Sequence, residues 1–417
     1  MLKIFLSLAA LIILTSCVTD TPAPIVGIPN RSIEQPSPFI TASASGAIED
    51  DNHPMPIAVL HYAKNAMRSV YEPADGIYLA AWLTPHTTKR EFVQQTGQDH
   101  AAFVRDIHIG DDIPVTWIIQ CIAVMATPIF IVHPPRAEQE NDPEFEIWEQ
   151  IAELAQQLGG FNLPMFVAFY PPVSGHGLIP AEYSFIFRYA RSLFLSYAPQ
   201  VAFVWVAPAL NSTIRNPFFP GSDVVDWVGV SLFASRGSNG LANVIEAFTP
   251  FYHRFQAHHP IMVLPLGVSH FSRYDHAYNI ADATAEIMRI YQALAGFPRV
   301  GLIAYGDVFG INPTRRDDFS ITIDNRLMAA YSEAVANSHF VSSLETNTAR
   351  SSRWVRSEYV GYVKEGRLYI DINTLAELSI TTPRNTTEIN ERSFVEVSRI
   401  TGRSVSFCEI RNVIKLY

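Results

Sequence analysis

Two carboxylates and two histidines of this chain come just after runs of apolar residues. Asp106 and Asp307 follow such runs, and so do His133 and His270. Two carboxyl groups about 5–9.5 Å apart can hydrolyse a glycosidic bond, one as acid and one as nucleophile or base. Histidines can ligate a metal, but the sequence has no H-E-x-x-H motif and no close carboxylate cluster, so we expect no metal and no cofactor.

The apolar runs are the elements that must position these side chains. From residue 75 onward, short apolar segments alternate with amphipathic helical patterns. Several segments are apolar without alternation, which is typical of parallel strands buried on both faces. The predicted strands are Gly76–Leu83, Ala102–Ile107, Thr127–Val132, Pro164–Phe169, Val201–Ala207, Val225–Leu232, Ile261–Leu266 and Val300–Tyr305.

Helical patterns lie between these strands. They cover Glu144–Leu158, Pro180–Tyr197, Leu241–His258, Ala277–Ala295 and Asp324–Ser338, while Pro114–Ala126 is apolar enough for a helix or an extra strand. Eight strands with intervening helices over roughly 265 residues predict an α/β fold, the (β/α)8 TIM barrel. An open doubly wound sheet is the main alternative, although no glycine-rich nucleotide loop follows the first strand.

Barrel closure would bring the polar residues to one mouth. The first strand of a closed barrel lies between the second and the eighth, so Asp106 and Asp307 could approach each other. The alternative is that Asp307 caps a turn and Asp106 is solvated. Aromatic rings near the same strand ends suit the apolar faces of sugars, although each could instead fill the barrel. The predicted ligand-binding residues are Trp82, His133, Tyr170, Trp205, Phe233, His270 and Tyr305.

Two motifs carry a family resemblance. The chain reads Val204-Trp-Val-Ala-Pro208 and then Phe219-Pro-Gly-Ser-Asp-Val-Val-Asp-Trp-Val-Gly229. Both resemble glycoside hydrolase family 26, the β-mannanase type, and His259 to Gly267 is similar to the Lys-Pro-Ile-Met-Ile-x-Glu-x-Gly strand of that family. The resemblance covers about residues 75–340 and implies a barrel that recognises polysaccharide.

The chain departs from the family at both catalytic positions. The resemblance puts the acid/base glutamate in the turn that reads Tyr170-Pro171-Pro-Val-Ser-Gly175 here, and it puts the nucleophile on Pro265. Proline cannot ionise, and losing one catalytic group typically costs several orders of magnitude in rate. We therefore expect an inactive barrel that binds a polysaccharide or cell-wall glycan, or acts as an envelope interaction module. The alternative is an active β-mannanase or β-glucanase that uses Asp106 and Asp307.

The first residues predict a lipoprotein signal peptide over residues 1–16. Lys3 precedes a short apolar run, and Leu14-Thr-Ser-Cys17 resembles a bacterial lipobox. The resemblance implies cleavage before Cys17, lipidation of its sulfur and an extracytoplasmic, membrane-anchored protein on the bacterial cell surface or the periplasmic face. An ordinary secretory signal is the alternative. Residues 17–55 are rich in Thr, Pro, Ser and Ala and predict a flexible tether.

Composition limits the partners and the domain count. With 417 residues, 48% of them hydrophobic, the chain can form one large domain and a small one. A net charge of −10 without a basic run argues against nucleic acid. Cys121 and Cys408 lie far apart and predict buried thiols rather than a disulfide framework.

The C-terminal part predicts a separate module. We expect the barrel over 56–342, a linker over 343–353 and a small α+β domain over 354–417. The segment around Leu368-Tyr-Ile-Asp371 is similar to the copper amine oxidase N-terminal-like, or stalk, domain of bacterial envelope proteins. That similarity implies an envelope protein partner for residues 354–417, but no copper, because the segment has no histidine cluster.

Overall fold

The computed structural model describes the barrel and the C-terminal module. The described residues are 54–64, 68–84, 86–136, 146–171, 178–207, 216–237, 240–272, 276–308, 317–346, 352–401, 403, 405–408 and 413–416. The predicted signal peptide, the lipidation site Cys17 and most of the predicted tether lie outside these residues. Within the described part, no helix has both the length and the hydropathy needed to span a bilayer.

Eight parallel strands form a closed barrel, as predicted. Each strand pairs with the next, and the last pairs with the first through Leu302 opposite Tyr78 to Asp307 opposite Leu83. The strands are β2 (Ile77–Leu83), β3 (Ala102–His108), β4 (Thr127–His133), β5 (Met165–Phe169), β6 (Val201–Val206), β7 (Trp227–Ala234), β10 (Ile261–Val268) and β13 (Val300–Asp307). The short β14 (Phe340–Val341) also pairs with β2.

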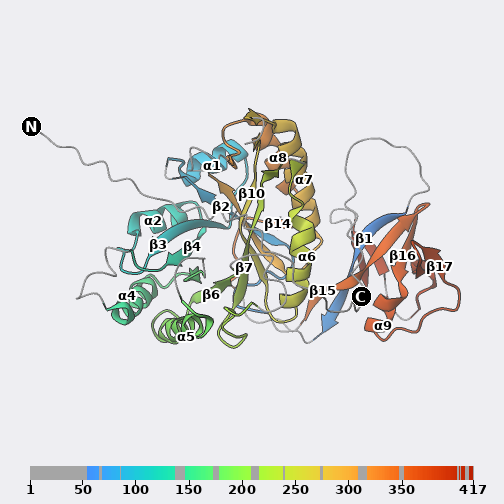
Figure 1. The fold of residues 1–417 in the computed structure, drawn as a ribbon, viewed down its shortest axis with the longest axis horizontal. Coiled ribbons are helices and arrows are strands. Elements are labelled where there is room, and N and C mark those ends of the chain that lie inside the picture. The colour runs from blue at the N-terminus through green and yellow to red at the C-terminus, as the bar shows by residue number, and fades with distance from the viewer. Residues whose placement is uncertain are drawn as a thin grey trace, which may run out of the picture.

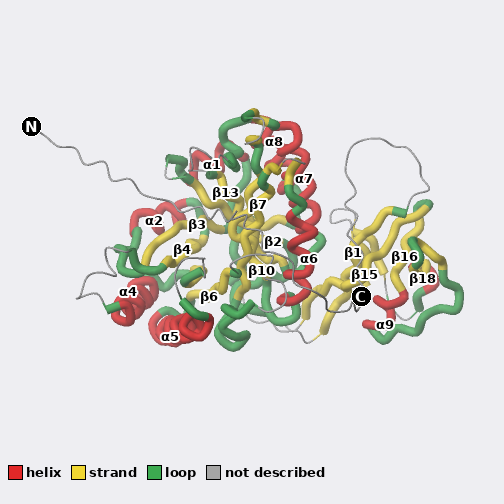
Figure 2. Tube along the Cα trace, viewed as in Figure 1, coloured by secondary structure: helices red, strands yellow, loops and turns green. Residues whose placement is uncertain are grey.

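Burial on both faces explains why these segments are strands. Every residue of β6 and β10 is buried. Successive side chains of a strand point to opposite faces, so one set fills the barrel and the other packs under the helices. The interior set includes Ala80, Val104, Ile129, Leu264 and Ala304. Figure 2 shows the yellow strands at the centre with red helices around them.

The helices follow the strands in the order expected for a TIM barrel. They are α1 (Lys89–Thr96), α2 (Val115–Ala123), α4 (Ile147–Gly160), α5 (Pro180–Tyr197), α6 (Val244–Phe255), α7 (Ile280–Ala295) and α8 (Asn325–Val335). The ambiguous segment 114–126 is therefore a helix, and Cys121 on its inner side is a buried free thiol. Burial raises the pKa of Cys121 to about 12.

Helix α1 was not predicted, although its N-terminus carries a recognisable signal. The Thr88 hydroxyl accepts a hydrogen bond from the backbone N–H of Glu91, and the Glu91 carboxylate accepts one from the backbone N–H of Thr88. This reciprocal capping box is the usual consequence of a Thr-x-x-Glu sequence. The apolar pattern of α1 is too short to predict a helix, whereas the Thr88-x-x-Glu91 sequence indicates its N-terminus.

The C-terminal module is a seven-stranded sheet with one helix. Its order is β17-β18-β16-β15-β1-β20-β19. The elements are β15 (Ser352–Lys364), β16 (Arg367–Asp371), α9 (Ile372–Glu377), β17 (Thr387–Ile389), β18 (Arg392–Glu396), η1 (Val397–Arg399), β19 (Val405–Cys408) and β20 (Val413–Leu416). The barrel loops contain four further strands of two residues each. They are β8 (Arg236–Gly237), β9 (Gly240–Leu241), β11 (Phe271–Ser272) and β12 (Ala277–Tyr278).

Strand β1 (Met55–Lys64) belongs to this module, which corrects the expected barrel boundary at residue 56. It pairs antiparallel with β15 and parallel with β20, and in Figure 1 the blue β1 lies among the red strands. Ile57 and Val59 are buried with Ile370 and Val395 in the module's own core. A closed barrel has no free edge for another long strand, whereas the open sheet does.

The module contacts the barrel at the end opposite the mouth, because its partners there lie just before β10 and β13. Arg356 of β15 donates to the carbonyl oxygen of Gly296 at 2.7 Å, and its guanidinium lies 3.8 Å from the centre of the Phe297 ring. Gln256 donates to the backbone oxygen of Arg356 at 3.3 Å. Burial lowers the pKa of Arg356 to about 10. These contacts all lie away from the mouth of the barrel.

A buried ion pair fastens the chain before β2 to the same end. Arg299 donates two hydrogen bonds of 2.7 Å to the carboxylate of Glu72, and a third of 2.7 Å to the carbonyl oxygen of Gln256. Glu72 also accepts from the backbone N–H of Ser69 at 2.8 Å. Both side chains of the pair are almost fully buried, so each depends on the other for compensation of its charge.

We expect Glu72→Ala to destabilise the barrel strongly. The substitution leaves the Arg299 guanidinium buried without its counter-charge, a loss of about 3–5 kcal/mol. Urea unfolding followed by tryptophan fluorescence measures this change. Arg326→Ala is the matched control, because Arg326 pairs with Asp324 at the surface and its loss should leave the unfolding midpoint nearly unchanged. Equal shifts for the two variants would contradict this assignment.

Candidate functional site

A carboxylate and an imidazole meet at the mouth of the barrel. Asp106 lies on the same face of β3 as Val104, and His133 lies on the same face of β4 as Ile131, so both point inward at the carboxyl ends of adjacent strands. His133 Nε2 is 2.7 Å from Asp106 Oδ1, and the two side chains keep 29% and 24% of their surface exposed. The pair is therefore open to a ligand.

A second imidazole completes this cluster. His108 faces the same way as Asp106, and its ring centre is 5.3 Å from that of His133. His108 Nδ1 lies 2.7 Å from the carbonyl oxygen of Pro134. Burial is the main cause that lowers the pKa of His108, and nearby Arg136 lowers it further. Sequence reasoning missed His108, although its position two residues after Asp106 already placed it on the same face of the strand.

An ion pair borders the cluster on the β3 side. Arg136 donates two hydrogen bonds to the carboxylate of Asp111, at 3.1 and 2.8 Å. Asp111 also accepts from the backbone N–H of His108 at 3.0 Å. Arg136 is the main partner that lowers the pKa of Asp111 against the opposing effect of its burial. This arrangement fixes the backbone from which His108 projects.

Two of the predicted aromatic residues remain at the mouth. Trp82 is half-buried at the end of β2 against the barrel interior. Phe233 at the end of β7 is 40% exposed and packs against Phe319, with ring centres 5.1 Å apart. A Cβ at Gly267 would lie 2.9 Å from both rings, so the glycine allows this close approach. Trp82 on β2 is thus next to the strand that carries Asp106, whereas Phe233 on β7 lies across the barrel from it.

The other predicted ligand-binding aromatics are in the core, which corrects that part of the prediction. Trp205 is fully buried and packs against Phe219 and Phe255, away from the interior residues of β6. Tyr305 is also fully buried, and Tyr170 is 6% exposed. The cause is strand alternation, because a ring near the end of a strand can face the helices instead of the mouth.

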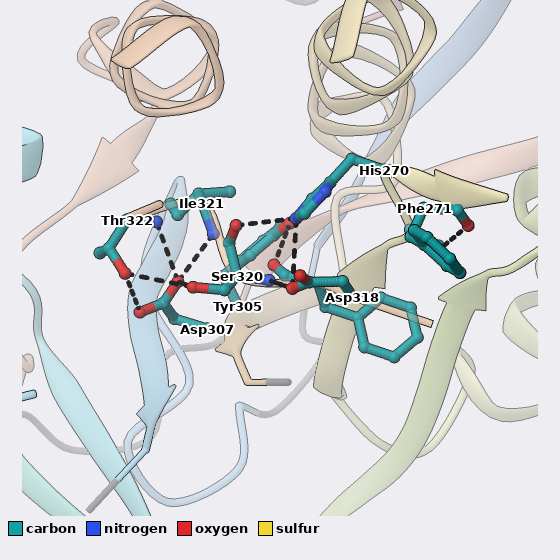
Figure 3. A network of polar contacts seen from close by, with 10 residues as sticks. His270, Phe271, Tyr305, Asp307, Asp318, Ser320, Ile321 and Thr322 are labelled. Carbon is teal, nitrogen blue, oxygen red and sulfur yellow. Dashed lines mark hydrogen bonds and ion pairs between the residues drawn. The ribbon is translucent and has the colours of Figure 1, made fainter. Parts of the chain in front are cut away.

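Asp307 does not approach Asp106, which corrects the predicted alternative pair. On β13 the interior positions are Leu302 and Ala304, so Asp307 points outward toward the helices. Figure 3 shows its carboxylate surrounded by the segment 320–322. It accepts hydrogen bonds from the Ser320 hydroxyl (2.9 Å), the Ile321 N–H (2.7 Å) and the N–H and hydroxyl of Thr322 (3.2 and 2.9 Å).

Burial raises the pKa of Asp307, and the four hydrogen bonds counteract the shift. Only 1% of the residue is exposed, so it cannot reach a substrate at the mouth. Its observed role is to fix the loop after β13. The same loop carries Phe319, whose carbonyl oxygen accepts a hydrogen bond from Tyr305 at 3.1 Å.

His270 belongs to this loop network rather than to an open site, which corrects its prediction as a ligand-binding residue. His270 is fully buried, with Nε2 3.0 Å from the Ser320 carbonyl oxygen and 3.3 Å from a carboxylate oxygen of Asp318. Figure 3 shows the ring pointing toward Ser320 and Asp318. Together, Asp307 and His270 join the ends of β13 and β10 through one loop.

The two positions that the sequence resemblance assigns to catalysis carry no ionisable group. Pro265 is buried at the end of β10, and a Cβ at Gly306 would lie 3.4 Å from the Pro265 Cβ. The Ser231 hydroxyl donates to the carbonyl oxygen of the preceding residue, Leu264, at 2.8 Å. Pro171 is buried after β5, and residues 172–177 lie outside the described part. Within the described residues, no group of three or more His, Cys, Asp or Glu side chains is arranged to hold a metal ion.

No family model matches the chain. A segment of 109 residues is 33% identical to "Beta-1,3-xylanase TXYA" of a Vibrio species, and 96 residues are 31% identical to a "Beta-1,3-xylanase" of an Alcaligenes species. The matches cover 24% and 21% of this chain and only 24% and 20% of those enzymes. The chain therefore matches about a quarter or less of each relative's length.

Solved structures show a similar arrangement. A modular endo-β-1,4-mannanase of glycoside hydrolase family 26 from Cellulomonas fimi matches with a TM-score of 0.47 and 13% identity, over 68% of this chain and 80% of that chain. The catalytic domain of a family 26 endo-β-1,4-mannanase from a Bacillus species matches with a TM-score of 0.46 and 13% identity, over 67% and 94%. Similarity at this level carries no conclusion about activity, and the barrel is established by its own strand pairing.

We expect Asp307→Asn to loosen the loop after β13. An amide offers one acceptor oxygen where the carboxylate offers two, so part of the four-donor network is lost, at a cost of about 1–3 kcal/mol in the free energy of unfolding. Amide hydrogen exchange at Ile321 and Thr322 should become faster. Asp106→Asn is the control, because this half-exposed side chain holds no loop and should change stability by less than about 1 kcal/mol. Unchanged exchange in Asp307→Asn would remove the loop-fixing role.

Proposed function

We propose that this protein is a glycan-binding barrel that has the frame of a glycoside hydrolase but not its hydrolytic pair. The observation that carries the proposal is Pro265, buried against Gly306 at the strand end where the family resemblance expects the nucleophile. Proline has no group that can attack an anomeric carbon or hold a proton. The second expected carboxylate is replaced in sequence by the turn that contains Pro171.

The relocated pair does not restore this chemistry. Glycoside hydrolysis needs two carboxyl groups about 5–9.5 Å apart on either side of the bond that breaks. Of the two candidates, Asp106 faces the mouth. Asp307 faces the helices, and its carboxylate oxygens accept hydrogen bonds from Ser320, Ile321 and Thr322. Asp106 is in turn hydrogen-bonded to His133. A single carboxylate can take only one of the two roles.

Glycan binding is supported by the composition of the mouth. Phe233 presents an exposed ring, and Trp82 adds a half-buried one. Asp106, His108 and His133 supply hydrogen-bonding groups near Trp82 and across the mouth from Phe233. Aromatic faces with a few polar groups suit pyranose rings, which have apolar faces and hydroxyl edges. The similar proteins bear the names mannanase and xylanase, which makes polysaccharides of these classes the first ligands to try.

We expect the full chain to bind at least one of β-1,4-mannan, β-1,3-xylan and mixed-linkage glucan without releasing reducing ends. Affinity electrophoresis measures binding, and a reducing-sugar assay measures turnover. Phe233→Ala should weaken binding about tenfold, the equivalent of one lost aromatic contact of roughly 1.4 kcal/mol. Phe185→Ala is the matched control, because Phe185 is 63% exposed on the outer side of α5.

Turnover that disappears in Asp106→Asn would overturn the non-hydrolytic reading and support an active glycosidase. Absence of binding to the whole panel, with a folded protein, would instead favour an envelope module that uses neither mouth nor sugar. In that case the C-terminal module, residues 354–417 with β1, becomes the candidate surface for an envelope protein partner.

We further propose that the chain is a lipoprotein anchored on the extracytoplasmic side of the membrane. The support is the sequence Leu14-Thr-Ser-Cys17 after a short apolar run. Acyl chains contribute about 0.8 kcal/mol of membrane affinity per buried CH2 group, and two chains are needed for stable anchoring, which a diacylglycerol on Cys17 would supply. The acidic surface would not assist, because it repels anionic lipid.

Cys17→Ala should move the protein from the membrane fraction to the soluble fraction of a bacterial host. Metabolic labelling with radioactive palmitate should label the protein with its original sequence and not the Cys17→Ala variant. Cys121→Ala is the control, because Cys121 is buried in the barrel and cannot carry a lipid. An equal membrane fraction for Cys17→Ala and the unmodified chain would refute lipid anchoring at this residue.

A further inference from the structure

Each of the two histidines at the mouth has one ring nitrogen in a hydrogen bond, and among the described residues the other nitrogen has no hydrogen-bond partner. A carbonyl oxygen only accepts, so His108 Nδ1 must donate its proton to the Pro134 oxygen at 2.7 Å. In the same way, His133 Nε2 donates to the carboxylate of Asp106 at 2.7 Å. In their neutral forms, His108 Nε2 and His133 Nδ1 therefore carry lone pairs.

This pattern is typical of histidines that ligate a metal. A ligating imidazole almost always donates its other N–H to a carboxylate or a backbone carbonyl, which fixes both tautomer and ring orientation. Here the Asp106 carboxylate accepts from His133, and the Pro134 carbonyl oxygen accepts from His108. Both histidines are only partly buried at the mouth, so a ligand can reach them.

Spacing and charge agree with a shared cation. Two imidazoles bound to one tetrahedral ion at about 2.0–2.1 Å have ring centres roughly 5 Å apart, and these rings are 5.3 Å apart. Within the described residues, the charged side chains at the cluster are Asp106, Asp111 and Arg136. Their formal charges sum to −1, which favours a cation over an anion.

We propose that His108 and His133 bind a divalent transition-metal ion at the barrel mouth, with Asp106 and the Pro134 carbonyl as the groups that orient them. Imidazole suits zinc and copper, and copper should bind more tightly than zinc. With two protein ligands in the described part of the chain, the remaining coordination positions fall to water or to ligand oxygens. The proposal does not depend on glycan binding, since the ion needs only these two side chains.

The test uses the full chain without a polyhistidine tag, freed of metal and titrated separately with Zn²⁺ and Cu²⁺ by isothermal calorimetry. We expect one ion per chain. His108→Ala and His133→Ala should each weaken binding at least tenfold, and Asp106→Asn should weaken it about 10–100-fold by releasing the His133 ring. His258→Ala is the matched control, because His258 is exposed at the opposite end of the barrel, just before β10.

A spectroscopic readout keeps the proposal testable even if a variant fails to fold. The electron paramagnetic resonance spectrum of Cu²⁺ on the unmodified chain should show coupling to two imidazole nitrogens. Coupling to fewer than two, or affinity that is unchanged in both histidine variants, would overturn the proposal. So would the absence of calorimetric binding by both ions.

Discussion

The closure of eight strands into one barrel is the constraint on which the rest of this structure depends. Once β13 pairs with β2, each strand residue must face either the packed interior or the helix layer. Near the strand ends, only residues whose side chains point to the same side as the interior residues can therefore reach a ligand at the mouth. We call such residues in phase with the interior. Asp106 is in phase with Val104, and Asp307 is out of phase with Ala304. That single difference separates an accessible carboxylate from a buried structural one.

The same constraint explains which features of the fold could be predicted from the sequence. Strands buried on both faces are continuous apolar runs, and so all eight were visible with small errors at their ends. The phase of a polar or aromatic residue at a strand end is harder to predict, because Trp205 and Phe233 occupy similar places in the pattern but face opposite ways. Strand β1 could not be placed either, since its partner β15 lies about 300 residues further along the chain.

The surroundings of Pro265 are unsuited to a carboxylate. Pro265 fills the end of β10 against Gly306, and the nearby Ser231 hydroxyl is used on a carbonyl oxygen. A carboxylate at this position would lose water without gaining a donor from these neighbours, and an uncompensated buried charge is very costly. The loop after β13 is in turn fixed by Asp307 and covers this side with Phe319. The β10–β13 side of the mouth is therefore dominated by apolar packing.

Polar groups persist on the opposite side, at the ends of β3 and β4. There a carboxylate, two imidazoles and an Arg–Asp pair are partly exposed, and within the described residues the side chains of Asp106 and His133 are hydrogen-bonded to each other. The Asp106–His133 contact adds little to stability, since partly exposed ion pairs contribute little. Asp111 and Arg136, by contrast, hold the backbone at His108. The two proposed ligands use separable parts of this face, since a sugar needs the Phe233 ring and a metal ion needs the imidazole nitrogens. The barrel is thus asymmetric at its mouth, with aromatic and apolar packing on the β7, β10 and β13 side and partly exposed polar groups at the ends of β3 and β4.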